Sequence, residues 1–209
     1  MRRNYLILII VLIMASGGLS FAPEPYHLVK TVFDGDTIQL DSGEKVRYLG
    51  INAPEIDHDA GSETECMAVD SKNLNDSLVR RKWVKLEFDQ VRQDRHGRLL
   101  AYVFLENGDM VNALLVRKGL AHVIGVKPNT RYFTPLLREQ RLAMDEKAGL
   151  WSRCSSRPET FYIGNANTLN FHRPQCPSIK KIFPGNVVRF ESRHKAFWEG
   201  FSPCRQCRP

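Results

Sequence analysis

The sequence lacks a hydrophobic run of the usual length for a membrane-spanning helix. Its main apolar run, from Tyr5 to Ala15, has 11 residues, whereas a membrane-spanning helix needs about 20. Two arginines precede the run, and the small-x-small pattern of a cleavage site follows it at Ser20-Phe21-Ala22. We therefore predict that residues 1–22 are an export signal and that the protein is periplasmic or secreted. The proline after this pattern disfavours cleavage, so an uncleaved N-terminal membrane anchor is the alternative.

Net charge is missing from most of the chain. Residues 27–154 hold 19 Lys and Arg against 19 Asp and Glu, whereas residues 155–209 hold 9 against 3. The charge of the whole chain, +7, therefore resides almost entirely in its last quarter. This asymmetry predicts a separate C-terminal module that attracts nucleic acid. Because a positive charge attracts any polyanion, a protein or membrane surface is the alternative partner.

Short strands and tight turns dominate the segment after the export signal. Alternation of apolar and polar residues predicts strands, and a longer apolar period predicts helices. The predicted strands cover residues 27–33, 37–40, 45–49, 83–88 and 99–105, and the predicted helices cover residues 67–79, 111–118 and 135–147. We expect a mainly β fold with α, a five-strand OB-fold β-barrel capped by helices. The expected domains are a barrel over 23–154, a linker over 155–160 and a small module over 161–209.

Three charged residues of the predicted barrel supply what phosphodiester hydrolysis requires. The reaction needs a base that activates water and positive charge that stabilises the phosphate oxygens. Asp36, Arg47 and Glu55 lie within about 20 residues of one another. Pro54 stiffens the loop that carries Glu55, which suits a carboxylate that must be held in place.

Five sequence blocks in the expected order resemble the staphylococcal nuclease (thermonuclease) family. The resemblance covers residues 27–151. The blocks are Asp34-Gly35-Asp36-Thr37, Arg47 to Glu55, Asp94-Arg95-His96-Gly97-Arg98, Met110 to Ala121, and Gly149-Leu150-Trp151. The resemblance implies a nuclease that acts on DNA, RNA or both, with Glu55 as general base and Arg47 and Arg98 on the scissile phosphate.

The resemblance also implies a catalytic calcium ion. Asp36 and the carbonyl oxygen of Ala53 would be ligands, and Asp34 would support them. Asn52 stands where the family has a second acidic ligand, and its amide oxygen is expected to be the third calcium ligand. Because one negative charge is missing, we expect weaker calcium binding. Residues 123–128 also lack the tyrosines that flank the substrate in the family, so no base preference is implied.

The C-terminal cysteines predict a structural zinc site. The order His-x₃-Cys followed by Cys-x₂-Cys gives four ligands of nitrogen and sulfur, His172, Cys176, Cys204 and Cys207. The segment resembles the zinc-binding domain of Ada-type repair proteins, although His172 replaces the cysteine that accepts a methyl group there, so methyl transfer is not expected. Two alternatives stay open: another fourth ligand in place of His172, and disulfide pairing among the three cysteines.

The remaining cysteines, Cys66 and Cys154, both lie in the predicted barrel domain. In an exported protein they are expected to form a disulfide, with two free buried thiols as the alternative. The protein is expected to be a monomer without a small-molecule cofactor. A non-catalytic nucleic-acid-binding barrel is the alternative to the enzyme.

Overall fold

The computed structural model describes residues 25–57, 64–155 and 157–209. The predicted export signal therefore lies outside the described residues. Within those ranges, no helix is both long and apolar enough to cross a membrane.

A closed five-strand barrel forms the first domain and confirms the predicted fold. Its strands run in the order β1-β2-β3-β6-β5. Neighbours are antiparallel except β3 and β6, which pair in parallel. The strands are β1 (Tyr26–Val32), β2 (Thr37–Leu40), β3 (Lys45–Tyr48), β5 (Trp83–Gln93) and β6 (Leu99–Leu105). Alternate residues of these strands point inward and fill the barrel, as Val29, Ile38, Val46, Leu86 and Val103 do.

Four helices and a two-strand ribbon surround the barrel. The helices are α1 (Ala68–Val79), α2 (Val111–Arg117), α3 (Phe133–Asp145) and the short α4 (Leu150–Arg153). The ribbon pairs β4 (Ile51–Asn52) with β7 (His122–Val123) in antiparallel register. Sequence periodicity did not predict this ribbon, because two-residue strands are too short to show a period.

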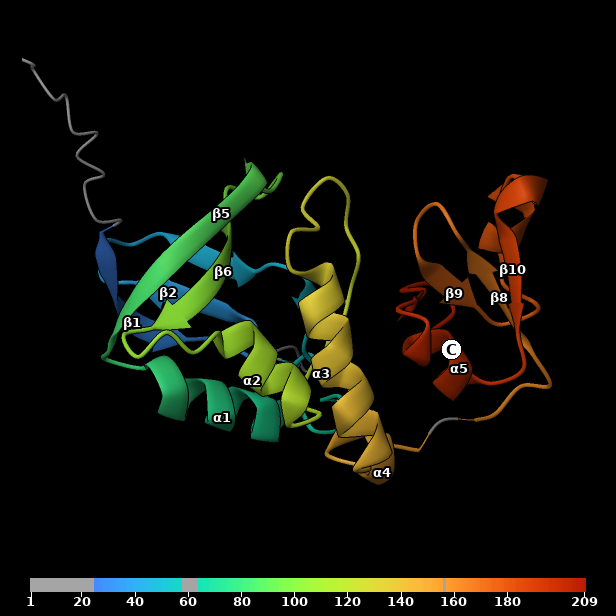
Figure 1. Cartoon of the computed structure of the whole chain (residues 1–209), viewed down its shortest axis with the longest axis horizontal. Coiled ribbons are helices and arrows are strands. Elements are labelled where there is room, and N and C mark those ends of the chain that lie inside the picture. The colour runs from blue at the N-terminus through green and yellow to red at the C-terminus, as the bar shows by residue number, and fades with distance from the viewer. Residues whose placement is uncertain (1–24, 58–63, 156) are drawn as a thin grey trace, which may run out of the picture.

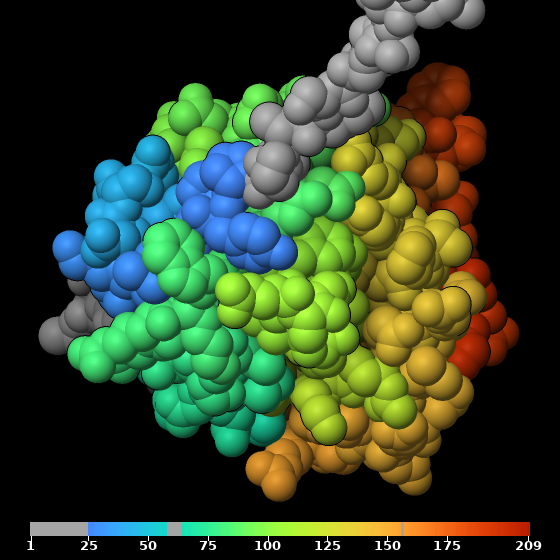
Figure 2. Space-filling model, turned by 60° about the vertical axis from the view of Figure 1, so that its left-hand side comes forward, coloured from blue at the N-terminus to red at the C-terminus, as the bar shows by residue number. Residues whose placement is uncertain are grey.

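The C-terminal module is a four-strand sheet with one short helix. The sheet order is β10-β8-β9-β11. The elements are β8 (Tyr162–Asn165), β9 (Asn170–His172), β10 (Val187–Phe190), β11 (Ser202–Pro203), α5 (Arg193–Trp198) and the 3₁₀ turns η1 (Pro177–Lys181) and η2 (Pro184–Asn186). Its apolar core includes Phe171 and Phe197, and also Met144 from α3. The module therefore packs on α3, which lies between it and the barrel (Figures 1 and 2).

Candidate active site and zinc site

The turn between β1 and β2 brings two carboxylates together. The backbone N–H of Asp36 donates to Asp34 Oδ1 at 2.8 Å. Only glycine fits between them, because a Cβ at Gly35 would lie 1.9 Å from Ser71 Oγ and 2.6 Å from Ala53 Cβ. The turn is thus pressed against α1 and against the loop that leads to Glu55, which fixes where both carboxylates point.

Asp36 lies at the centre of the site and is 3 % exposed. Its Oδ2 accepts a hydrogen bond from the Ala53 N–H at 2.6 Å and forms an ion pair with Arg47 Nη1 at 2.9 Å. Its Oδ1 accepts from Thr37 Oγ1 at 3.1 Å. The structure therefore brings together three of the predicted residues, Asp36, Arg47 and Ala53.

Arg47 projects from β3 and is held by the turn that follows. Its Nη1 donates to the carbonyl oxygens of Tyr48 and Ile51, both at 3.0 Å, and its Nη2 donates to Asn52 Oδ1 at 2.9 Å. Only 8 % of the residue is exposed. A guanidinium fixed by this many acceptors is pre-organised.

Asn52, an expected calcium ligand, forms hydrogen bonds with Arg47 and Ala53 through its side-chain amide. Its amide oxygen accepts from Arg47, and its Nδ2 donates to the Ala53 carbonyl oxygen at 3.1 Å. In this arrangement the Asn52 side chain orients Arg47 and donates to the Ala53 carbonyl oxygen, which is itself an expected calcium ligand.

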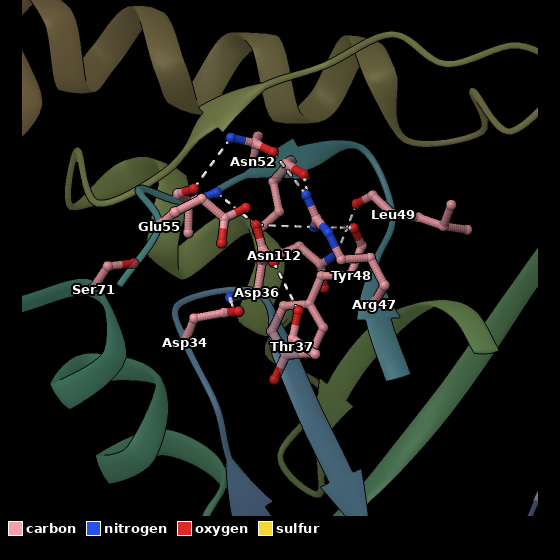
Figure 3. A network of polar contacts seen from close by, with 12 residues as sticks. Asp34, Asp36, Thr37, Arg47, Tyr48, Leu49, Asn52, Glu55, Ser71 and Asn112 are labelled. Carbon is pink, nitrogen blue, oxygen red and sulfur yellow. Dashed lines mark hydrogen bonds and ion pairs between the residues drawn. The ribbon is translucent and has the colours of Figure 1, made fainter. Parts of the chain in front are cut away.

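Glu55 is accessible to solvent, but its neighbours partly desolvate its carboxylate, and its backbone is fixed. Its N–H donates to Glu65 Oε2, and its carbonyl oxygen accepts from the Glu65 N–H, both at 3.0 Å. Figure 3 shows the Glu55 side chain beside Asp36 and on the same side of Arg47 as Asp34. Burial and the charge of Asp34 raise the pKa of Glu55, although Arg47 opposes the shift. A raised pKa brings a carboxylate closer to the range of an effective general base.

The three carboxylates have a donor set that fits a hard cation. Burial, followed by the charges of Asp34 and Glu55, raises the pKa of Asp36 to about 7 even though Arg47 lowers it. The positive charge of Arg47 thus does not balance the negative charges of the three carboxylates, whereas a divalent cation would. Oxygen ligands of this kind suit calcium. These carboxylates do not converge as tightly as a closed metal site; among the described residues, only the histidine–cysteine group of the C-terminal module does so.

Arg98 comes from the β5–β6 hairpin. Its Nε donates to Asp94 Oδ2 at 2.7 Å. It stands two residues before Leu100, which pairs with Arg47 across β3 and β6. Arg98 thus lies directly before β6, at the end of the strand that pairs with β3, the strand that carries Arg47.

Asn75, which the sequence analysis missed, joins Asp34 to Tyr48 and so holds the site together. Asn75 Nδ2 donates to the Asp34 carbonyl oxygen at 2.9 Å, and its Oδ1 accepts from Tyr48 Oη at 2.9 Å. Asn75 is fully buried on α1. The available signal was its position four residues before the buried Val79, which places an amide on the apolar face of the helix.

The zinc ligands predicted in the C-terminal module meet in space. One donor atom from each of His172, Cys176, Cys204 and Cys207 lies within 4.8 Å of the others. His172 Nδ1 is buried without a hydrogen-bond partner, and burial lowers the pKa of this histidine. A neutral imidazole and thiolates form a closed tetrahedral zinc site, so the residues fit the metal. Outside this module, Cys66 and Cys154 are joined by a disulfide.

Comparison with known proteins gives two family matches. The staphylococcal nuclease homologue family matches residues 45–153, and the metal binding domain of Ada matches residues 149–209. The chain is 33 % identical to the thermonuclease of Staphylococcus hyicus over 140 residues, which are 66 % of this chain and 82 % of that protein.

Two Bacillus subtilis (strain 168) proteins are also similar. The SPbeta prophage-derived endonuclease YokF and the endonuclease YncB are each 38 % identical to this chain over 125 residues, 57 % of its length. The match spans 42 % of YokF and 58 % of YncB, less than two thirds of either. The chain therefore belongs to the staphylococcal nuclease family of phosphodiester-hydrolysing enzymes, and a metal binding domain of the Ada type follows its nuclease domain.

Proposed function

We propose that the protein is an exported, calcium-dependent nuclease that hydrolyses phosphodiester bonds in DNA, with RNA as a second substrate class. The observation that carries the proposal is the group formed by Asp36, Arg47 and Glu55, in which a buried ion pair lies beside a base with a raised pKa. The printed names of the relatives, thermonuclease and endonuclease, agree with it.

Each residue has a role that its position supports. Glu55 accepts a proton from the attacking water. Arg47 and Arg98 donate to phosphate oxygens and stabilise the charge that develops on them. Asp36 and the Ala53 carbonyl oxygen, with Asp34 nearby, would hold a calcium ion, which would supply further positive charge. In this proposal Asn52 holds Arg47 in place of a ligand role, which is consistent with weak calcium binding.

Cleavage assays test the enzymatic proposal. The purified protein is given circular single-stranded DNA, circular double-stranded DNA and RNA, with calcium or with a chelator. We expect calcium-dependent cleavage of circles, which shows endonuclease action, and a large loss of kcat in Glu55→Gln. The rival function, a barrel that only binds nucleic acid, is favoured if calcium has no effect and Glu55→Gln behaves as wild type.

The C-terminal module is proposed to hold a structural zinc ion and to aid nucleic-acid binding. The orphaned nitrogen of His172 supports the metal, and the net charge of +6 over residues 155–209 supports the polyanion. We expect one zinc per chain, lost in Cys204→Ser. A stoichiometry near zero in the wild-type protein would contradict the site.

Export is proposed from the N-terminal pattern and from the disulfide. Cys66 and Cys154 are bonded in the structure, and disulfides persist in oxidising compartments. Cell fractionation and N-terminal sequencing of the isolated protein test this. A protein found in the cytosol with its first residues intact would contradict the proposal.

A further inference from the structure

A buried side chain of α3 joins the C-terminal module to β7 of the nuclease domain. Gln140 is 0 % exposed. Its Oε1 accepts from the Val123 N–H at 2.7 Å, and its Nε2 donates to the carbonyl oxygen of Phe197, on α5, at 2.7 Å. Buried hydrogen bonds of this kind specify a single arrangement of the groups that they join. The two elements, β7 and α5, are therefore fixed relative to each other.

Two further contacts bring the module directly onto β7 and the residues that follow it. The His122 ring lies edge-on to the Phe197 ring, with centroids 5.4 Å apart and an angle of 71° between the planes. A Cβ at Gly125 would lie 2.7 Å from Cδ1 of Leu169, which lies between β8 and β9 of the module. The module thus contacts both β7 and the loop after it without an intervening layer of side chains.

The strand β7 in turn supports the strand that carries Asn52. It pairs with β4 in antiparallel register, with His122 opposite Asn52, and the Ile124 N–H donates to the Gly50 carbonyl oxygen at 2.9 Å. Side chains of directly opposite residues lie on the same face of two paired strands, with Cβ atoms about 4.5–5.5 Å apart. The His122 side chain therefore neighbours both Asn52 and the Phe197 ring.

The strand β4 holds the guanidinium of Arg47. Arg47 Nη2 donates to Asn52 Oδ1 at 2.9 Å (Figure 3), and Nη1 donates to the Ile51 carbonyl oxygen at 3.0 Å. A series of contacts thus runs from Phe197 of the module through His122 and Asn52 to Arg47. The position of this guanidinium decides how well it meets a phosphate, and a misplacement of about 1 Å can slow a reaction on the order of a hundredfold.

We propose that the C-terminal module is part of the scaffold of the nuclease active site and that His122 is the positioning residue through which it acts. Phe197 holds the His122 ring, and His122 keeps the Asn52 side chain where it accepts from Arg47. The inference rests on the proposed nuclease function and deepens it, because the module then sets the geometry of Arg47 in addition to attracting nucleic acid. His122 itself does not touch the substrate.

The NMR signal of the Arg47 Nε–H tests the inference without catalysis. The full chain is used, and the signal is assigned by its loss in Arg47→Lys. We expect His122→Ala to shift or broaden this signal, because Asn52 loses the ring beside it. His122→Phe keeps a ring against Phe197 and should retain the wild-type signal. His122→Leu, which keeps apolar volume without the ring, should give an intermediate change.

His194→Ala is the matched control, because it removes the same ring from a contact with the same helix, α5. His194 is exposed and stacks on Trp198, with centroids 6.1 Å apart. We expect the Arg47 signal of this variant to equal that of the wild-type protein. Zinc content is measured in every variant and should be unchanged, which excludes unfolding of the module as the cause of a shift.

Steady-state kinetics at saturating calcium test whether the effect passes through Asn52. We expect His122→Ala to lower kcat about tenfold in the otherwise wild-type protein. In an Asn52→Ala background the same substitution should lower kcat by about twofold or less, because the contact that leads to Arg47 is already lost. A role in stability alone would give equal factors in both backgrounds, and that result would overturn the inference.

An Arg47 signal that is unchanged in His122→Ala, or changed equally in His194→Ala, would also overturn it. The proposed function fails by a different result, the absence of calcium-dependent cleavage by the wild-type protein. Because the NMR signal reports the surroundings of Arg47 whether or not the protein cleaves nucleic acid, the two failures are distinguishable.

Discussion

At the scale of single residues, the candidate site is defined by an imbalance of charge. Asp34, Asp36 and Glu55 lie near one another, and Arg47 is the basic residue paired with Asp36. Burying an ion pair costs desolvation that the pair itself offsets only partly. A site of this kind is therefore poised to take up a cation, and its carboxylates influence one another's protonation.

The effect of Asp34 on Glu55 predicts a shift in pH dependence. Glu55, as the proposed base, would act only when ionised, so activity is expected to fall as the pH falls through its pKa, which burial and Asp34 raise. Asp34→Asn removes one raising charge and lowers that pKa. The acid limb of kcat/KM should then move to lower pH when measured at saturating calcium. Asp41→Asn, in the exposed β2–β3 turn, is the control; a limb that stays in place in Asp34→Asn would argue against the assignment of Glu55.

The amide of Asn52 predicts a low affinity for calcium, which the substitution Asn52→Asp should raise. Asn52→Asp adds a carboxylate next to Ala53 and Asp36, and more negative ligands raise affinity for calcium. The calcium concentration that gives half-maximal activity should fall several-fold, up to about tenfold. A titration of activity with calcium in both proteins measures it. An unchanged midpoint would mean that position 52 serves only to orient Arg47.

The identities of the central residues could be predicted from sequence, but their contacts could not. Asp36, Arg47 and Glu55 occur in blocks whose order resembles a known family, and the structure brings them together. The hydrogen bond from Arg47 to Asn52 depends on a side-chain rotation that no pattern encodes. Asn75 was missed for the same reason, since its partners Asp34 and Tyr48 lie 41 and 27 residues away in the chain.

At the scale of elements, the long periodic segments were predictable and the short ones were not. The five barrel strands and the helices α1, α2 and α3 show alternation or helical periodicity. The β4–β7 ribbon has two residues in each strand and depends on tertiary contacts. Helical spacing places Gln140 between Leu136 and Met144 on the buried face of α3, but only the structure identifies its partners.

Gln140→Leu should separate the two parts of the molecule. The substitution leaves the Val123 N–H buried without its partner and removes one donor from the Phe197 carbonyl oxygen, which keeps the Gly200 N–H. An unpaired buried donor costs about 1–3 kcal/mol, so we expect unfolding in urea to show a loss of about 2 kcal/mol and the module to unfold before the barrel. Arg138→Leu, an exposed position on the same helix, is the control and should change stability little. Equal stabilities of the two variants would show that the Gln140 hydrogen bonds contribute nothing to the stability of the folded protein.

At the scale of the whole molecule, the sequence separates two parts that the structure packs together. The change in charge after residue 154 and the two cysteine sets predict distinct domains. A module of about 50 residues has too little core to be stable without further support, and here it draws on zinc ligands and on Met144 of α3. The contact combines apolar packing with hydrogen bonds from Gln140 and Arg141 to residues 57 positions away, so neither composition nor net charge reveals it.

The disulfide predicts how the nuclease domain responds to reduction. It joins Cys66 to Cys154 across 88 residues of chain, and Cys66 follows Glu65, which holds the backbone of Glu55. A link that closes a loop of this length contributes up to about 4–5 kcal/mol in the chain-entropy model. The double variant Cys66→Ser, Cys154→Ser should therefore be less stable in urea and should have a lower kcat, because Glu55 is held less firmly.

Dithiothreitol should lower the stability and the kcat of the wild-type protein to those of the variant and should leave the variant unchanged. Zinc content is measured in both proteins, so that loss of the module's metal is not mistaken for reduction of the disulfide. A wild-type protein whose stability and kcat do not respond to reduction would show that the link neither stabilises the domain nor positions its base.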